Sequence, residues 1–488
     1  MAGCLGVSLL GTLFMPSCFP SANKIWIQTV QMPDRFVWHH NLSTISYLSL
    51  LNVRMTILKN DKPTIRAWAM FDWANSAYNL VITSTIFPAY YTAITFTEAH
   101  GDRVTFFGIE VVNTALSSFA LSVAYLIMAL LLPILSSVAD FKGNKKTFMM
   151  AFTYLGGIAC MGLFFFTLET LEWGIICFTL AAMGYVGGVL FNNSYLPQIA
   201  TVDQQDRVSA QGFAYGYVGC VTIQIICFVF ILKPEWFGIT DPSFPPRLSF
   251  LLVGLWWIGF AQIPFLKLPK DARNNGRVTG HVLRKGFAEL RDVWVRLREI
   301  PEIKRFLPAF FCYAMGVQTV MIVAAAFGEK VLHLGAPKLI ATILLIQLVA
   351  IGGAYLMSLL ARFIGNVRVL MLVVCVWIGI CISAYYIQHE VQFYVLAALV
   401  GLVMGGIQSL SRSTYSKLLP ANETDTASFF SFYDVTEKVA IVIGLFSFAL
   451  IEQITRNIRY SALSLGLFFV LGLVLLSRML MLKKAAAA

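Results

Sequence analysis

Charged residues are scarce in this sequence. They make up 12% of the 488 residues, whereas hydrophobic residues make up 58%. Soluble globular proteins carry about 25% charged residues. A chain with so few charges cannot cover a surface that faces water. The composition therefore excludes a soluble enzyme and a disordered chain, and it indicates a protein that crosses the membrane many times.

The sequence also lacks the patterns of a disulfide framework or a catalytic centre. Most of the nine cysteines lie in apolar stretches, where a thiol behaves as a small hydrophobe. The six histidines are scattered, without metal-ligand spacing, and no phosphate loop of the GxxxxGK[ST] type occurs. We therefore expect no enzymatic activity, no catalytic residues, no bound metal and no cofactor.

Twelve apolar stretches are long enough to cross a bilayer core of about 30 Å, which takes roughly 20 helical residues. They are continuous, whereas the strands of a transmembrane barrel would alternate in segments of about ten residues, so we predict an all-α membrane protein. The predicted spans cover residues 67–96, 107–138, 147–168, 173–197, 208–232, 248–268, 306–332, 339–361, 368–388, 391–419, 429–452 and 461–482.

Residues 1–66 lie outside this series as an N-terminal extension, and residues 483–488 form a C-terminal tail. The apolar run from Cys4 to Phe14 is too short to span a membrane and follows no basic residue, so it does not resemble a signal peptide. Met55 opens a segment typical of a natural start. Residues 1–54 are therefore either a start placed too far upstream, with Met55 as the true first residue, or a genuine disordered tail.

The basic residues of the loops predict the orientation. With twelve spans, the loops on the side of both termini hold 24 Lys and Arg residues, and the opposite loops hold seven. Basic loops stay in the cytoplasm, so we expect both termini there, in a bacterial inner membrane. The net charge of +11 then follows from topology and does not indicate nucleic-acid binding.

The long loop 269–305 separates six spans (67–268) from six more (306–482). Its segment Val282–Leu297 has a basic amphipathic pattern typical of a helix on the inner membrane surface, either a tether or a partner-binding element. Phe141-Lys142-Gly143-Asn144 recurs as Phe363-Ile364-Gly365-Asn366, 222 residues later, and Leu196-Pro197 recurs as Leu419-Pro420 at an offset of 223. This repetition predicts two pseudo-symmetric six-helix bundles, an architecture of secondary transporters with the substrate between the repeats.

The loop Asp140-Phe141-Lys142-Gly143-Asn144-Lys145-Lys146 resembles the short cytoplasmic signature of the major facilitator superfamily. The resemblance implies that Asp140 caps a neighbouring helix N-terminus and helps to latch the cytoplasmic side shut. Arg362 stands in place of this Asp in the second copy, so we expect the latch in the first half only.

Four further blocks narrow the resemblance to one branch of the superfamily. Over residues 65–480 the chain is similar to the vacuolar amino-acid effluxer associated with autophagy and to its bacterial relatives. This resemblance implies transport, with amino acids as the leading substrate class and efflux as a direction. The blocks are Asp72-Trp73-Ala74-Asn75-Ser76-Ala77-Tyr78-Asn79; Leu196-Pro197-Gln198-Ile199-Ala200 with Arg207-Val208-Ser209 and Gly212-Phe213-Ala214-Tyr215-Gly216-Tyr217; Gly405-Gly406-Ile407-Gln408-Ser409-Leu410-Ser411-Arg412-Ser413; and Phe429-Phe430-Ser431-Phe432-Tyr433 with Glu437-Lys438.

Polar side chains form a stripe on the first predicted span, at steps of three and four residues. It cannot face lipid, so it either lines a cavity that binds substrate or holds helices together. The stripe consists of Asp72, Asn75, Ser76, Asn79 and Thr83.

Four charged residues in later spans need a partner or an aqueous cavity, because an ionised group in hydrocarbon costs a few kcal/mol or more. They are Arg412, Asp434, Glu437 and Lys438. Arg412 lies at a depth comparable to that of Asp434 and Glu437, and we predict that it pairs with one of them. It then holds a substrate carboxylate, forms a gate ion pair or has a purely structural role.

Carboxylates that alternate between burial and a nearby cation can carry protons, and Glu437 and Asp72 are the candidates that we favour. Further candidate substrate contacts are Asn192, Asn193, Gln211, Tyr215 and Gln408. We predict a monomeric secondary transporter that moves a small polar solute across the bilayer, and we hypothesise that one of these carboxylates couples transport to protons. The alternative is a membrane scaffold or receptor that keeps a transporter fold without transport.

Overall fold

A computed structural model of the chain describes residues 59–96, 101, 103–269, 282–420 and 424–485. Its contacts separate residues 1–56 from a compact unit of residues 57–488, and the description below concerns that unit. The two hypotheses on residues 1–54 and Met55, and the last residues of the tail, lie outside the described residues.

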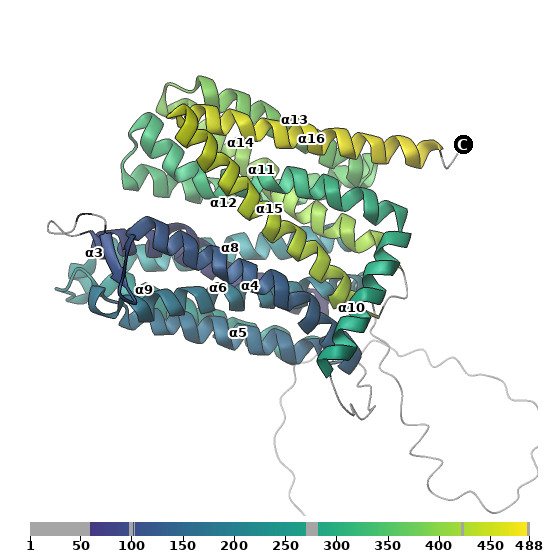
Figure 1. The fold of residues 1–488 in the computed structure, drawn as a ribbon, viewed down its shortest axis with the longest axis horizontal. Helices are drawn as coiled ribbons and strands as arrows, with labels where there is room; N and C mark the ends of the chain where they lie inside the picture. Colours follow the sequence, from purple (N-terminus) through teal and green to yellow (C-terminus); the bar gives the residue numbers. More distant parts are fainter. Residues whose placement is uncertain (1–58, 97–100, 102, 270–281, 421–423, 486–488) are drawn as a thin grey trace, which may run out of the picture. The chain divides into compact units, whose positions relative to one another are not determined.

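Long helices dominate the described residues, and each predicted span has a counterpart among them (Figure 1). Eleven helices of the described residues are long and apolar enough to cross a membrane. The first predicted span is not among these eleven, because a π-helical segment divides it into pieces that are each too short. With it, the described residues contain twelve spans. The spans are α2 Lys62–Ala77 with η1 Tyr78–Thr85 and α3 Ile86–Thr95, α4 Asn113–Lys142, α5 Lys145–Gly162, α6 Leu171–Ser194, α8 Gln205–Leu232, α9 Phe244–Lys267, α11 Pro301–Leu332, α12 Ala336–Ile364, α13 Asn366–Tyr386, α14 Glu390–Leu418, α15 Thr426–Thr455 and α16 Ile458–Ala485.

Short elements join these helices. The linker helix α10 connects the sixth and seventh spans, and the remaining elements are single turns or two short strands. They are η2 Leu163–Phe165, η3 Leu168–Thr170, α7 Leu196–Ile199, η4 Pro234–Phe237, α10 Val282–Glu299, β1 Arg103–Phe106 and β2 Ile109–Val112.

The predicted start of the second span at residue 107 is wrong. Residues 103–112 form an antiparallel hairpin of β1 and β2, and α4 begins only at Asn113. Phe107 and Gly108 connect the strands, both with positive φ, as a two-residue hairpin turn requires. β-branched residues then favour the two strands, so this apolar segment is extended and not helical.

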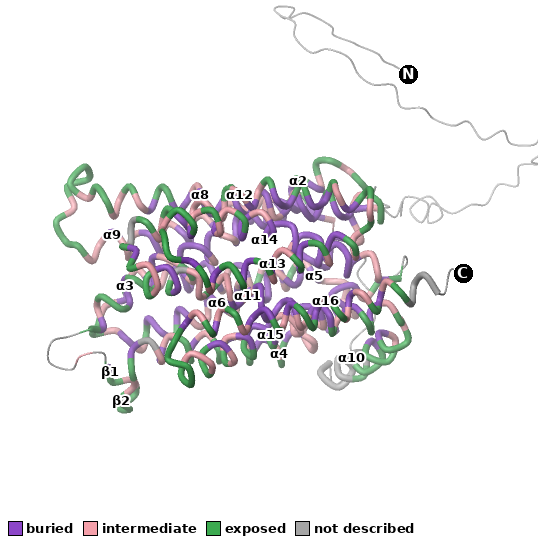
Figure 2. Tube along the Cα trace, turned by 90° about the horizontal axis from the view of Figure 1, so that it is seen from above, coloured by how far each residue is buried: buried purple, intermediate pink, exposed green. Residues whose placement is uncertain are grey.

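Two hydrophobic cores correspond to two groups of spans, from α2 to α9 and from α11 to α16. We call them the first half and the second half. The first core takes all its buried residues from 65–268 except Ala427, and the second takes all of its own from 293–479 except Tyr217. Figure 2 shows buried residues on the sides of the helices that face other helices, whereas the outward sides are exposed. Each half therefore packs around a core of its own.

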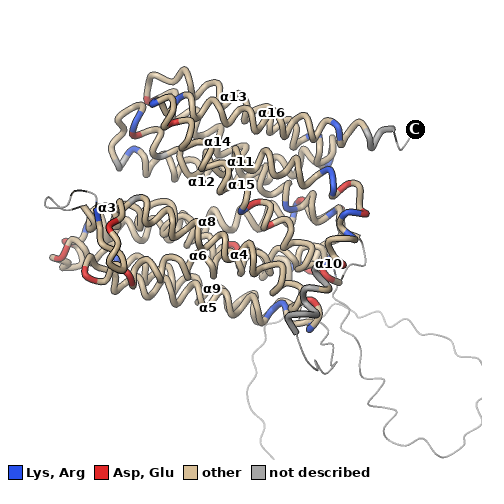
Figure 3. Tube along the Cα trace, viewed as in Figure 1, with Lys and Arg blue, Asp and Glu red and all other residues tan. Residues whose placement is uncertain are grey.

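Charged residues gather at the two ends of the helices, with few between them (Figure 3). We call one end the basic end: α4 ends there with Lys142, α5 begins with Lys145, and α15 begins with Thr426. The other is the hairpin end, where β1 and β2 lie. The few charges between the two ends are therefore the ones that a site inside the helices can use.

The amphipathic segment of the linker forms α10, which packs against α4 of the first half and against α11 and α15 of the second half. Val293 and Leu297 are buried, as the pattern predicts, whereas Trp294 is 42% exposed and stacks against Phe432. The side chains of Leu283, Phe287 and Leu290 and the linker residues 270–281 lie outside the described part. Helix α10 thus bridges the two halves at the basic end.

Candidate functional site

A cavity of about 160 Å³ lies between the two halves. One water molecule needs roughly 10–15 Å³ of cavity volume measured in the same way, so the cavity has room for several water molecules or a small solute. Polar and charged side chains from both halves line it, together with aromatic rings. They include Asp72, Asn75, Ser76, Asn79, Tyr125, Tyr185, Asn193, Tyr217, Tyr313, Gln318, Gln347, Gln408, Ser411, Arg412, Tyr433, Asp434, Glu437 and Lys438.

Arg412 on α14 closes the cavity toward the basic end and is 3% exposed. Its Nη1 lies 3.0 Å from Asp72 Oδ2 on α2 and donates to Asn193 Oδ1 on α6 at 3.1 Å. Its Nε donates to Ser209 Oγ at 3.0 Å, and its Nη2 to the Ser209 carbonyl at 2.8 Å, both on α8. These bonds use four of the five N–H groups of a guanidinium.

Two aromatic rings cover the guanidinium. The centroids of Phe213 and Trp68 lie 4.2 Å and 4.7 Å from Arg412 Cζ. A cation over aromatic faces gains up to about 2 kcal/mol when it is desolvated. Arg412 is therefore held by first-half groups from three helices and has little donor capacity left for a solute in this state.

The prediction that Arg412 pairs with Asp434 or Glu437 is wrong in this structure. Its ion-pair partner is Asp72, while Glu437 pairs with Lys438. Equal depth was the basis of the prediction, and depth does not define the direction in which a side chain leaves its helix. Arg412 points from α14 toward α2 and α8 of the first half.

A second charged cluster lies on α15 of the second half. Lys438 Nζ donates to Glu437 Oε2 at 2.6 Å, and Gln318 Nε2 on α11 donates to Glu437 Oε1 at 2.8 Å. The ring of Tyr125 on α4 lies 5.7 Å from Lys438 Nζ. Asp434, one turn before Lys438, is 2% exposed, and its Oδ2 has no hydrogen-bond partner.

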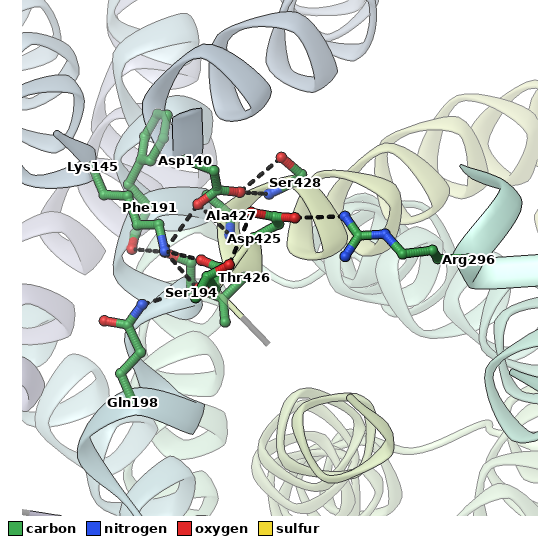
Figure 4. A network of polar contacts seen from close by, with 11 residues as sticks. Asp140, Lys145, Phe191, Ser194, Gln198, Arg296, Asp425, Thr426, Ala427 and Ser428 are labelled. Carbon is green, nitrogen blue, oxygen red and sulfur yellow. Dashed lines mark hydrogen bonds and ion pairs between the residues drawn. The ribbon is translucent and has the colours of Figure 1, made fainter. Parts of the chain in front are cut away.

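The first turn of α15 holds the halves together at the basic end (Figure 4). Asp140 Oδ2, at the end of α4, accepts the backbone N–H and the hydroxyl of Ser428, each at 2.7 Å, and Asp140 Oδ1 accepts the N–H of Ala427 at 3.3 Å. A carboxylate is stabilised there because the helix N-terminus carries partial positive charge. We call these contacts, with the ones in the next paragraph, the α15 latch.

Three more side chains converge on the same turn. Lys145 lies 2.9 Å from Asp140 Oδ1 and donates to the carbonyl of Thr424 and the hydroxyl of Thr426. Gln198 donates to the Thr426 hydroxyl at 3.1 Å. Arg296 of α10 pairs with Asp425. The cap that the signature implies for Asp140 is present in this geometry, and its role in transport stays a prediction.

The second copy of the signature, at residues 362–368, also contacts the other half, although the missing Asp predicts a latch in the first half only. Asn366 Nδ2 donates to Asp206 Oδ1 on α8 at 2.7 Å, and Lys417 pairs with the other oxygen of Asp206. The carboxylate that the second copy lacks is thus supplied by the first half. We call this group the Asp206 contact.

The described polar contacts between the halves extend from the basic end to mid-depth. The Ser209 hydroxyl donates to the Ser409 carbonyl at 2.7 Å, and the hydroxyl of Tyr217 donates to Gln408 Oε1 at 2.7 Å. On α11 the cavity lining runs from Phe310 to Met321, over about 16 Å at 1.5 Å per residue. The cavity therefore extends from Arg412 toward the hairpin end.

The structure brings most of the sequence candidates to the cavity. Asp72, Asn75, Ser76 and Asn79 line it, and so do Asn193, Gln408 and the four charged residues of α14 and α15. The remaining candidates Asn192, Gln211 and Tyr215 are not among its lining residues. Asn192 instead donates to Asp72 Oδ1 at 3.3 Å.

Sequence reasoning missed several cavity residues. Tyr125, Tyr185, Tyr217 and Tyr433 line the cavity, but aromatic residues are common in membrane helices and carried no signal. Gln318 and Gln347 also line the cavity, and each is a single glutamine whose position in the sequence does not distinguish a cavity residue from a helix-packing residue.

The comparisons with known proteins now identify the family. The family described as "Vacuole effluxer Atg22 like" matches residues 60–488. The chain belongs to this family. An uncharacterized MFS-type transporter, YxiO of Bacillus subtilis, is 30% identical over 84% of this chain and 93% of its own length. Autophagy-related protein 22 of Eremothecium gossypii is 26% identical over 74% of this chain and 76% of its own length.

Solved structures support the fold. The E. coli fucose:proton symporter FucP has a TM-score of 0.62 at 14% identity, over 86% of this chain and 98% of its own. The proton:xylose symporter XylE has a TM-score of 0.64 at 11% identity, over 84% of this chain and 94% of its own. These two structures confirm the predicted twelve-helix fold. The family match and the similarity to YxiO confirm the predicted branch, so the protein is a multi-pass membrane transporter of the major facilitator superfamily.

Proposed function

We propose that this transporter moves a small polar solute by alternating access of its two halves, with amino acids as the leading substrate class. One observation carries the proposal: one cavity is lined by charged and amide groups of both halves, including Asp72 of the first half and Arg412 of the second. The resemblance to the vacuolar amino-acid effluxer supports the substrate class, and the family description supports efflux.

Three residues that line the cavity favour a solute with both donors and acceptors, because each carries a buried polar atom without a partner. Asn75 Nδ2, Gln347 Oε1 and Asp434 Oδ2 have no hydrogen-bond partner among the described groups. A buried polar group without a partner costs about 1–3 kcal/mol, which a bound solute would recover. A zwitterion offers both kinds of group.

The contacts of Arg412 favour a gate over a carboxylate-binding role. Four of its N–H groups bind the first half, although Arg412 belongs to the second half. In the proposed cycle these bonds, the α15 latch and the Asp206 contact break together when the basic end opens. A proton taken up by a carboxylate of the cavity provides the coupling.

We propose that the basic end faces the cytoplasm of a bacterial cell, with both termini inside and the protein acting as a monomer. The surplus of basic loop residues on this side supports the orientation. A fluorescent protein fused after Ala488 tests it, because such a fusion matures in the cytoplasm. Activity of a C-terminal reporter that works only outside the inner membrane would reverse the orientation.

Counterflow in proteoliposomes tests transport itself. A purified transporter should exchange internal unlabelled solute for external labelled solute, whereas liposomes without protein should not. Absence of counterflow for every solute that binds would favour the scaffold or receptor alternative. Binding is measured first by thermal shift with amino acids, peptides, sugars and nucleosides, because a ligand stabilises the folded state. Stabilisation by sugars alone would overturn the amino-acid assignment but not transport.

A further inference from the structure

Asp434 is the one charged residue of the cavity wall without an ion-pair partner in the described residues. The wall holds five charged side chains. Arg412 pairs with Asp72 at 3.0 Å and Lys438 pairs with Glu437 at 2.6 Å. If Asp434 is ionised, the wall carries one uncompensated negative charge. If Asp434 is protonated, the wall is neutral.

The position of Asp434 favours a group that gains and loses a proton. The residue is 2% exposed, it lines the cavity, and its Oδ2 has no hydrogen-bond partner. Desolvation disfavours the charged form of a carboxyl, and the two cations of the cavity wall each pair with another carboxylate. A bound proton gives the group an O–H that can donate a hydrogen bond.

The groups around Asp434 come from several elements. Its own helix α15 contributes Tyr433, Glu437 and Lys438, and α14 contributes Arg412 and Tyr415. Helix α6 contributes the amide of Asn193. These neighbours of Asp434 have neighbours of their own on two further helices. On α11, Tyr313 lies near Tyr433 and Gln318 donates to Glu437, and on α4 the ring of Tyr125 lies near Lys438. Both cations of this set already have a carboxylate partner.

The two halves divide the partners of Arg412 in a way that connects Asp434 to the gate. Asp72 and Ser209 belong to the first half, whereas Arg412 and Asp434 both belong to the second. When the halves part at the basic end, Arg412 loses its first-half partners. Asp434 belongs to the same half as Arg412 and already interacts with it electrostatically. It can therefore replace Asp72 as the carboxylate partner of Arg412.

We propose that Asp434 binds the coupling proton while Arg412 is paired with Asp72, and releases it when Arg412 turns from Asp72 to Asp434. The proton binds Oδ2 from the hairpin side and leaves to the basic side, so one proton crosses per cycle. This inference rests on the proposed transport function and specifies its coupling site. It assigns the role to Asp434 and not to Glu437 or Asp72, each of which has a cation in this structure.

Asp434→Asn tests the assignment, because the amide cannot exchange a proton. With one proton per solute, a pH difference of one unit supports a solute gradient of up to about tenfold. In proteoliposomes the wild type should build a gradient of several-fold, and Asp434→Asn should build none. Counterflow, which needs no net proton movement, should persist in the variant.

Glu452→Gln is the matched control, with the same chemical change on the same helix but outside the cavity wall, where Glu452 pairs with the exposed Lys330. It should retain a pH-driven gradient. Retention of the gradient in Asp434→Asn, or an equal loss of the gradient in Glu452→Gln, would overturn the assignment. Absence of counterflow in the wild type would instead count against the proposed function.

Infrared spectroscopy gives a readout that needs no solute. The C=O band of a protonated carboxyl should be present in the wild-type protein and in Glu452→Gln, and the part of it that belongs to Asp434 should vanish in Asp434→Asn. An unchanged band in Asp434→Asn would show that Asp434 is ionised in this state and would sink the proposal even if transport is normal.

Discussion

Arg412 Nη1 and Asp72 Oδ2 lie 3.0 Å apart although their residues are 340 positions apart in the chain. The pair joins α14 of the second half to α2 of the first at the wall of the cavity. Both residues are buried, although both also line the cavity. Its contribution to stability and its contribution to transport can be separated by substitution.

Arg412→Ala should lower the unfolding free energy by about 3–5 kcal/mol, because it leaves the Asp72 carboxylate buried without its cation. The double variant Asp72→Asn/Arg412→Gln removes both charges and should be less destabilised than Arg412→Ala. Unfolding of purified protein in detergent measures both. If the double variant is destabilised as much as Arg412→Ala or more, the buried carboxylate is not the cause of the loss.

Gly212→Ala should disrupt the same pair by steric means. A Cβ at this position would lie 2.7 Å from Arg412 Nη2 and 2.8 Å from Trp68 Cζ3. Overpacking of this kind costs about 1–3 kcal/mol, and we also expect lower counterflow. Gly259→Ala on α9 is the control, because nothing lies within 4 Å of its Cβ. It should change stability by less than about 1 kcal/mol. Equal losses in both variants would contradict the predicted clash.

Asp140→Asn should weaken the α15 latch and increase the population that is open at the basic end. The amide leaves Lys145 without its anion and offers the α15 N-terminus a weaker acceptor. Spin labels at the exposed positions Asp203 and Arg362, in a cysteine-free background, should show longer distances in the variant. Glu110→Gln in the exposed hairpin serves as the control and should leave the distances unchanged. Identical distance distributions in all three proteins would remove Asp140 from the gate.

Lys145 and Arg296 reach the same turn of α15 but should differ in their effect on stability. The Lys145–Asp140 side chains are 3% and 0% exposed, whereas those of Arg296 and Asp425 are 40% and 20% exposed. Lys145→Met should therefore lower the free energy of unfolding by about 2–5 kcal/mol, because the buried carboxylate of Asp140 loses this cation. Arg296→Met should lower it by less than about 1 kcal/mol. Thermal unfolding of the two variants measures the difference, and a larger loss of stability in Arg296→Met would contradict the argument from burial.

The sequence predicted the parts of the site that follow helical periodicity. Asp72, Asn75, Ser76 and Asn79 recur at steps of three and four residues, and all four line the cavity. Thr83 continues the pattern in the sequence but is not a lining residue. The π-helical segment η1 begins at Tyr78 and closes its hydrogen bonds over one more residue per turn, so it shifts the face that later residues occupy.

Partners across helices could not be predicted in the same way. Depth along a span placed Arg412 level with two carboxylates of α15, but the direction of its side chain depends on how α14 packs against α2 and α8. The hairpin β1–β2 is a different case. The sequence does contain a hairpin pattern here, with Gly108 between two runs that include β-branched residues. Because the segment is also apolar, its last residues were assigned to the following membrane span.

The convergence of Asp140, Lys145, Gln198 and Arg296 on one turn of α15 makes the release of that turn cooperative. Each side chain loses its partner through the same displacement, so the bonds cannot be given up singly while the turn stays in place. In the proposed cycle we therefore expect half-released states to be sparsely populated, so that this end is either closed or open. A two-state end of this kind would limit leakage of small ions during each turnover.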